Sequence, residues 1–147
     1  MTERLATLAG DLVDLLRRQP EHRLRSLSLR MAEVAEAHVG LGDPRLDEAI
    51  AALRAGRIGN GVMRTRLQQL TDELDEVAWD LQDRVKSGSA ANEEYMKAFA
   101  RARAVSAAWF ALDPDPVKAA VEATYEAQAA INDLALIRRE ISSVISS

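Results

Sequence analysis

The sequence predicts an all-α protein of about six helices, and three observations carry this prediction. Large apolar residues recur at steps of three and four through most of the chain, which is the period of one helix face. No stretch alternates apolar and polar residues for long, so no strand is expected. Glycines and Asp-Pro pairs interrupt the apolar pattern at intervals, as they do at helix ends.

Composition bounds the class of protein. The chain has 147 residues, so residues 1–147 are expected to form a single helical domain. Its 48% hydrophobic and 29% charged residues are typical of a folded globular protein. No apolar run approaches the ~18 residues that span a bilayer, and the absence of cysteine excludes disulfides and thiolate chemistry. We expect a soluble, cytoplasmic protein without a membrane partner.

Three helices are expected in a smaller N-terminal subdomain. Thr2 is a suitable N-cap for the first helix, and Pro20 ends it. The second helix begins at about Glu21 and ends at Gly40, a glycine in the C-cap position. The third helix begins at the Asp43-Pro44 pair, which supplies an N-cap and a first-turn proline, and closes at the glycine-rich segment 56–61. That segment is a tight loop or a hinge between candidate subdomains 1–58 and 61–147.

The most regular helix lies within residues 63–85. Its apolar residues step alternately by four and three, as in the seam of a coiled coil: Met63, Leu67, Leu70, Leu74, Val77 and Leu81. The triplet Ser87-Gly88-Ser89 is interpreted as its stop, a turn and the N-cap of the next helix.

The remaining chain predicts two more long helices. The first, from about residue 90 to 112, is rich in alanine, which lets neighbouring helices approach closely. Asp113-Pro114-Asp115-Pro116 forms a rigid corner, and the last helix runs from there nearly to the C-terminus. The three long helices, residues 62–146, are expected to share one seam as an antiparallel bundle packed against the N-terminal subdomain. The leucine stripe is therefore expected to be core.

The sequence contains parts of catalytic motifs but no complete one. Glu73 and Glu76 form one Glu-x-x-Glu pair on an acidic helix face, but none of the later glutamates that could begin the second pair of a helical magnesium site has an acidic residue three positions on: Glu93, Glu94, Glu122 and Glu126. A metal-dependent helical hydrolase is kept as an alternative on this face. No catalytic residue, metal ligand or cofactor is assigned, and the chain is expected not to be an enzyme.

His38 ends an apolar stripe near a helix C-terminus. A partly buried structural histidine is the favoured interpretation. The alternative is a phosphotransfer histidine, which would be exposed and would need a nearby lysine or arginine to hold the phosphate. Val39 to Gly42 supply neither.

Segment 43–70 imitates a helix-turn-helix, with Arg64 and Arg66 near the start of the second helix. A small DNA-binding regulator is therefore another alternative. The turn is long and glycine-rich, however, and the helix becomes acidic from Asp72, where it would meet phosphates. Nucleic acid is not expected as a partner.

Trp79 lies on the polar face of the helix within residues 63–85, ~140° from the middle of the leucine stripe. It either packs against a second neighbour in the bundle or anchors an interface, where tryptophan is enriched. The leading hypothesis is a non-catalytic protein–protein interaction module: an adaptor, a regulatory subunit or an inhibitor of a partner whose identity the sequence does not give. Self-association as a homodimer is the companion hypothesis. The candidate partner-binding residues are Asp72, Asp75, Trp79 and Gln82.

Overall fold

The computed structural model describes residues 4–59 and 61–147, and these form helices and short connections with no strand among them. The all-α prediction is confirmed, although the described residues form seven helices instead of about six. The predicted cap at Thr2 lies outside the described residues. The helices are α1 (Arg4–Arg17), α2 (Glu21–Val39), α3 (Pro44–Arg54), α4 (Gly61–Lys86), α5 (Asn92–Ala111), α6 (Pro116–Ile131) and α7 (Leu134–Ser146).

The extra helix arises because the expected last helix breaks at Asn132. This residue has a φ of 56°, in the left-handed region that asparagine tolerates better than most residues. Its N–H closes α6 by donating to the Gln128 carbonyl at 2.7 Å, and the Asp133 carboxylate then caps α7 by accepting from the Leu136 N–H at 3.1 Å. The apolar pattern of the sequence continues across this break and therefore did not predict it.

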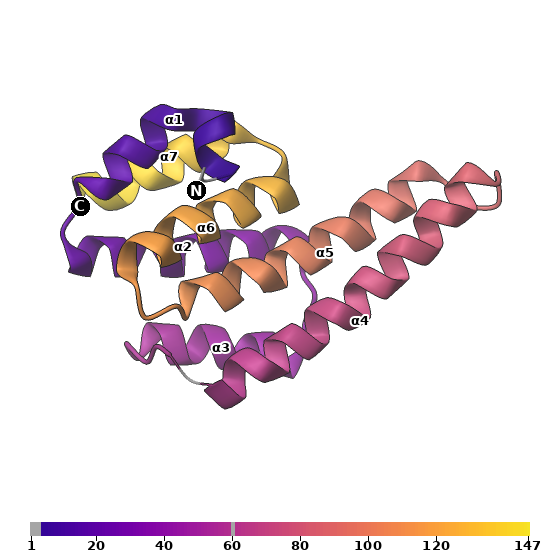
Figure 1. The fold of residues 1–147 in the computed structure, drawn as a ribbon, viewed down its shortest axis with the longest axis horizontal. Coiled ribbons are helices and arrows are strands. Elements are labelled where there is room, and N and C mark those ends of the chain that lie inside the picture. The colour runs from indigo at the N-terminus through magenta and orange to yellow at the C-terminus, as the bar shows by residue number, and fades with distance from the viewer. Residues whose placement is uncertain (1–3, 60) are drawn as a thin grey trace.

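The packing of the long helices differs from expectation in one respect. α5 packs along both α4 and α6, but α4 and α6 do not pack against each other to any extent. α2 takes the expected place of α4 and lies across α5 and α6 (Figure 1). A helix from residues 1–58 therefore completes the bundle of residues 61–147, and one hydrophobic core contains residues of both segments.

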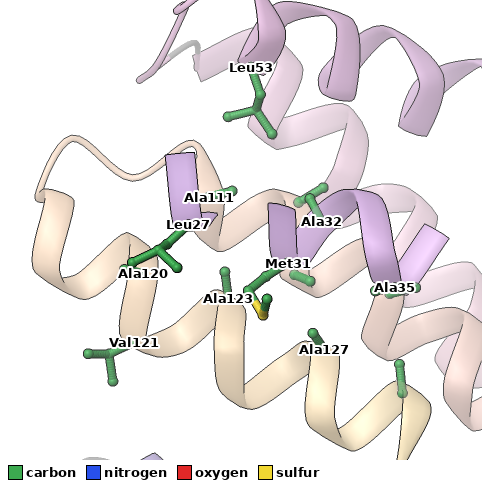
Figure 2. Packing of buried hydrophobic residues seen from close by; sticks show 14 of the residues in the cluster. Leu27, Met31, Ala32, Ala35, Leu53, Ala111, Ala120, Val121, Ala123 and Ala127 are labelled. Atoms are coloured by element: carbon green, nitrogen blue, oxygen red, sulfur yellow. The ribbon is translucent and has the colours of Figure 1, made fainter. Parts of the chain in front are cut away.

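Large side chains of α2 pack against small ones in this core. Figure 2 shows Leu27 and Met31 directed toward α6, where Ala120, Ala123 and Ala127 face them. All five side chains are almost completely buried. Alanines on one helix let the neighbouring axis approach closely. α2, and not α4, occupies this alanine face of α6.

Local signals placed several helix ends correctly. Gly40 has a φ of 58° and its N–H donates to the Glu36 carbonyl at 2.8 Å, as expected of a glycine C-cap. The Asp43 carboxylate accepts from the Arg45 N–H at 2.8 Å. Asp115 caps α6 by accepting from the backbone N–H groups of the first turn.

The predicted cap at Ser89 is wrong. α5 begins at Asn92, and its N-cap residue Ala91 makes no side-chain capping bond. The Ser89 hydroxyl instead donates to the Arg84 carbonyl at 3.3 Å, and the Ser89 N–H donates to the same oxygen at 2.8 Å. Ser89 therefore closes the end of α4, whose free carbonyls compete successfully for the serine.

The corner between α5 and α6 is tied to distant parts of the chain. Arg25 of α2 donates to the carbonyl oxygens of Asp113 and Pro114, both at 2.6 Å. The Gly59 N–H donates to the Leu112 carbonyl at 2.7 Å. This bond anchors the glycine-rich segment at its C-terminal end, which favours a fixed loop over a hinge; Asn60 lies outside the described residues.

α4 and α5 form an antiparallel pair that extends beyond the other helices, to the right in Figure 1. Ala78 and Ala98 are the last buried residues toward its tip, and no residue from 79 to 97 is buried. We call residues 79–97 the distal arm and the remaining described residues the body. Toward the tip of the distal arm, the two helices have only each other as neighbours (Figure 1).

Candidate functional site

Trp79 lies at the start of the distal arm with 62% of its surface exposed. The sequence left open whether Trp79 packs against a second neighbouring helix or is available for an interface. Its exposure shows that it does not pack against a second helix. A tryptophan side chain is large and mostly apolar, so this exposure leaves a substantial apolar surface in water.

The leucine seam is core only in part. Leu67 and Leu70 are buried where α4 lies against the body, as expected. Farther along, Val77 is 52% exposed, so the prediction is wrong for this residue. The seam was expected to face both α5 and α6, whereas α4 packs mainly against α5, and Ala78 instead of Val77 is buried at this level.

Asp75, one of the four candidate residues, belongs to a structural ion network at the base of the arm. Its carboxylate lies 3.1 Å from Arg103 of α5, and Arg103 also lies 3.2 Å from Glu126 of α6. Glu126 is almost fully buried and is paired a second time, with Arg4 at 2.9 Å. A buried carboxylate needs such partners because desolvation penalises its charge. Asp75 is thus part of a network that joins α4, α5 and α6 at the base of the arm.

The other two candidates border Trp79 differently. Asp72 is exposed and accepts a hydrogen bond from Gln68 at 3.0 Å. Gln82 is half-buried. Both lie on the Trp79 side of α4, within ~60° of it by the 100° rotation per residue.

The sequence-based set missed Glu76 and Asp83. They stand three residues before and four residues after Trp79, the positions that adjoin it on a helix surface. Both are exposed, and neither makes an ion pair among the described residues. Helical spacing alone could have identified them, but only the structure shows that they are unpaired. We call Trp79, Glu76 and Asp83 the Trp79 face.

This part of α4 is strongly acidic. Residues 71–83 contain six aspartates and glutamates and no lysine or arginine. Besides Asp75, Glu73 is paired with Arg45 of α3 at 2.8 Å, and Asp80 lies 3.9 Å from Arg84. The unpaired carboxylates can accept hydrogen bonds from arginine or lysine, and the indole ring attracts a cation to its face. The arrangement suits a ligand that is both basic and apolar.

α5 extends the apolar part of this surface. Because antiparallel helices rise equally per residue, the Asp75–Arg103 pair sets Trp79 at the level of Phe99. Phe99 is half-buried, with its ring centre 6.1 Å from that of Tyr95. Met96, 45% exposed, lies one turn farther toward the tip. Trp79 stands four residues after Asp75, and Phe99 and Met96 stand four and seven residues before Arg103, so all three lie on the side of the arm where that ion pair forms.

The arginines of the helix-turn-helix alternative have partners within the chain. The Arg64 guanidinium stacks 3.8 Å above the Trp109 ring and lies 3.6 Å from the Asp113 carboxylate. Arg66 is paired with Glu48 at 2.6 Å. A phosphate contact from either residue would have to compete with these interactions.

Two other predictions concern the described part of the chain. Within residues 4–59 and 61–147, no three histidine, aspartate or glutamate side chains gather as a metal ion would require. Glu73, one member of the Glu73–Glu76 pair, is the partner of Arg45. Within the same residues, no helix is both long enough and apolar enough to cross a bilayer.

His38 is exposed at the end of α2. The expected partial burial is wrong because the last buried residue of α2 is Ala35, one turn before His38. The cations that its own sequence neighbours lack come from α5: His38 and Val39 line a recess together with Lys97, Ala100 and Arg101.

Comparison with known proteins adds no relative: no family model matches the chain, and neither a curated protein nor a solved structure is significantly similar to it.

Proposed function

We propose that this chain is a non-catalytic protein–protein interaction module whose Trp79 face binds a basic segment of a partner protein. The observation that carries the proposal is the exposure of Trp79 in a distal arm without a buried residue. Adaptor, regulatory subunit and inhibitor are the three roles such a module can have, and the partner decides among them. A cytoplasmic location belongs to the same proposal.

The expected energetic role of Trp79 is that of an anchor. Covering its exposed apolar surface at about 25 cal/mol per Å² would contribute about 2–4 kcal/mol to binding. Tryptophans that contribute this much are typical of the centre of an interface, surrounded by residues that contribute less.

The charge of the partner follows from Glu76 and Asp83. Their carboxylates would meet lysine or arginine side chains in a basic segment, which steers association and makes it sensitive to salt. The same charges disfavour a homodimer through this face, since two-fold symmetry would bring identical carboxylates together. We therefore favour a different protein as partner over a second copy, and sedimentation at high micromolar concentration is expected to show a monomer.

The test compares three full-length baits in extracts of the native cell: the wild-type chain, Trp79→Ala and Val77→Ala. Val77 is the matched control because it is also an exposed apolar residue of α4, on the opposite flank of the α5 contact. A partner of the proposed kind is captured by wild type and Val77→Ala and lost with Trp79→Ala. Its binding also weakens when Glu76→Gln and Asp83→Asn are combined. Equal capture by the Trp79 variant would refute the proposal.

A further inference from the structure

A second surface lies where the C-terminal end of α2 meets α5. His38 and Val39 from α2, with Lys97, Ala100 and Arg101 from α5, line a recess of about 320 Å³. Lys97 and Arg101 stand two residues before Phe99 and Arg103, so they lie ~160° around α5 from those residues. The recess is therefore on the opposite side of the helix from the Trp79 face.

The polar side chains of this recess are basic or neutral. No aspartate or glutamate lines it, and Lys97, Arg101 and His38 are all exposed to solvent. Neither Lys97 nor Arg101 forms an ion pair among the described residues, in contrast to Arg45, Arg66 and Arg138. Like charges four residues apart on a helix repel each other. An anion bound between them would remove this repulsion.

We propose that the recess binds the phosphoryl oxyanion of a small ligand through His38, Lys97 and Arg101. Arginine offers a planar fork of N–H donors, lysine offers an ammonium group, and the imidazole adds an N–H. This donor-rich set matches the acceptor-only oxygens of a phosphate and disfavours a cation. The recess is also several times the ~30 Å³ share of one water molecule, so a small organic group fits beside the phosphate, against Val39 and Ala100.

A purely structural role for the same side chains makes a different prediction. The last carbonyls of α2 carry partial negative charge, and basic residues nearby can stabilise a helix end. In that case Lys97→Gln and Arg101→Gln would lower thermal stability, and phosphate would not bind saturably.

The experiment is a titration of the full-length chain with inorganic phosphate at constant ionic strength, with chloride as the exchanged anion and imidazole resonances as the signal. His38 is expected to shift saturably, with a dissociation constant in the millimolar range, while His22 serves as the internal reference. Lys97→Gln and Arg101→Gln should each weaken binding about fivefold to tenfold, the loss of one charge-assisted hydrogen bond. Arg139→Gln is the matched control, because Arg139 is another exposed arginine without an ion pair among the described residues.

Phenyl phosphate in a parallel titration identifies the source of the oxyanion. Binding at least threefold tighter than that of inorganic phosphate would assign a phosphate monoester, and equal binding would assign free phosphate. A linear, unsaturable shift, or equal shifts of His22 and His38, would overturn the proposal, as would unchanged affinity in the Lys97 and Arg101 variants. Trp79→Ala should bind phosphate like wild type, so this site and the Trp79 face fail or succeed separately.

Discussion

α4 and α5 run through both the body and the distal arm, where they are under different constraints. In the body, α5 touches α2, α4 and α6, and from Ala104 to Ala108 every residue is buried. In the distal arm no residue is buried, and toward its tip α4 and α5 have only each other as neighbours (Figure 1). Packing therefore explains the buried apolar residues of the body but not Trp79. We propose that a partner protein, and not packing within the chain, accounts for a tryptophan at this position.

Truncating the seam at two points of α4 should give the largest contrast between the regions. Leu67→Ala removes a fully buried side chain of the body and is expected to lower the free energy of unfolding by about 2–5 kcal/mol. Val77→Ala, in the exposed part of the same seam, is expected to change it by no more than about 0.5 kcal/mol. Urea unfolding of both variants measures these values. Comparable losses would mean that the seam is core along its whole length.

Breaking an ion pair in each region should give a smaller contrast of the same sign. Arg103→Met at the base of the arm leaves Glu126 buried with Arg4 as its remaining partner, and we expect a loss of about 1–3 kcal/mol. Arg84→Met removes a pair in the distal arm whose members are both about half-exposed or more, and should cost no more than about 0.5 kcal/mol. Thermal unfolding of the two variants decides this. A neutral Arg103 variant would show that the network does not fasten the arm.

Acid should weaken the body through its carboxylates. Hydrogen bonds from Arg138 lower the pKa of Asp11, in the contact of α1 with α7, and hydrogen bonds from Arg45 lower that of Asp43. A lowered folded-state pKa contributes stability above the unfolded value of ~3.9, and this contribution is lost as pH falls through the folded-state value. These two groups should therefore add no pH dependence between pH 7 and 5 and should destabilise the fold below about pH 4.

Asp11→Asn serves as the control, because it removes one of these carboxylates. Urea unfolding at pH 5, 4 and 3 is expected to show a weaker acid dependence in this variant than in wild type. The same acid dependence in both proteins would exclude Asp11 as a contributor.

Sequence and structure agree best where structure is determined locally. Gly40, Asp43 and Asp115 act within one helical turn of their own position, so their neighbours in the sequence were enough to predict them. Asn132 also acts locally. The helix break there is marked by neither a glycine nor a proline, however, and the apolar period continues past it. The exchange of α4 for α2 in the bundle could not be predicted, because it depends on which alanine faces meet in space.

The residues of the candidate site were likewise predictable only where local spacing determines their position. Trp79 could be singled out because its position on α4 depends only on helical spacing. The ion pair between Asp75 and Arg103, 28 residues away, could not be predicted from periodicity. His38 was assigned to a partly buried environment because its basic neighbours, Lys97 and Arg101, belong to another helix.

The affinity of Trp79→Ala for the partner that wild type captures, measured by calorimetry beside its free energy of unfolding, tests the central claim most directly. We expect an unfolding free energy within about 0.5 kcal/mol of wild type and a loss of affinity of at least about thirtyfold, or ~2 kcal/mol. A large loss of stability would make Trp79 part of the core. Unchanged affinity would show that the partner binds elsewhere and would contradict the account.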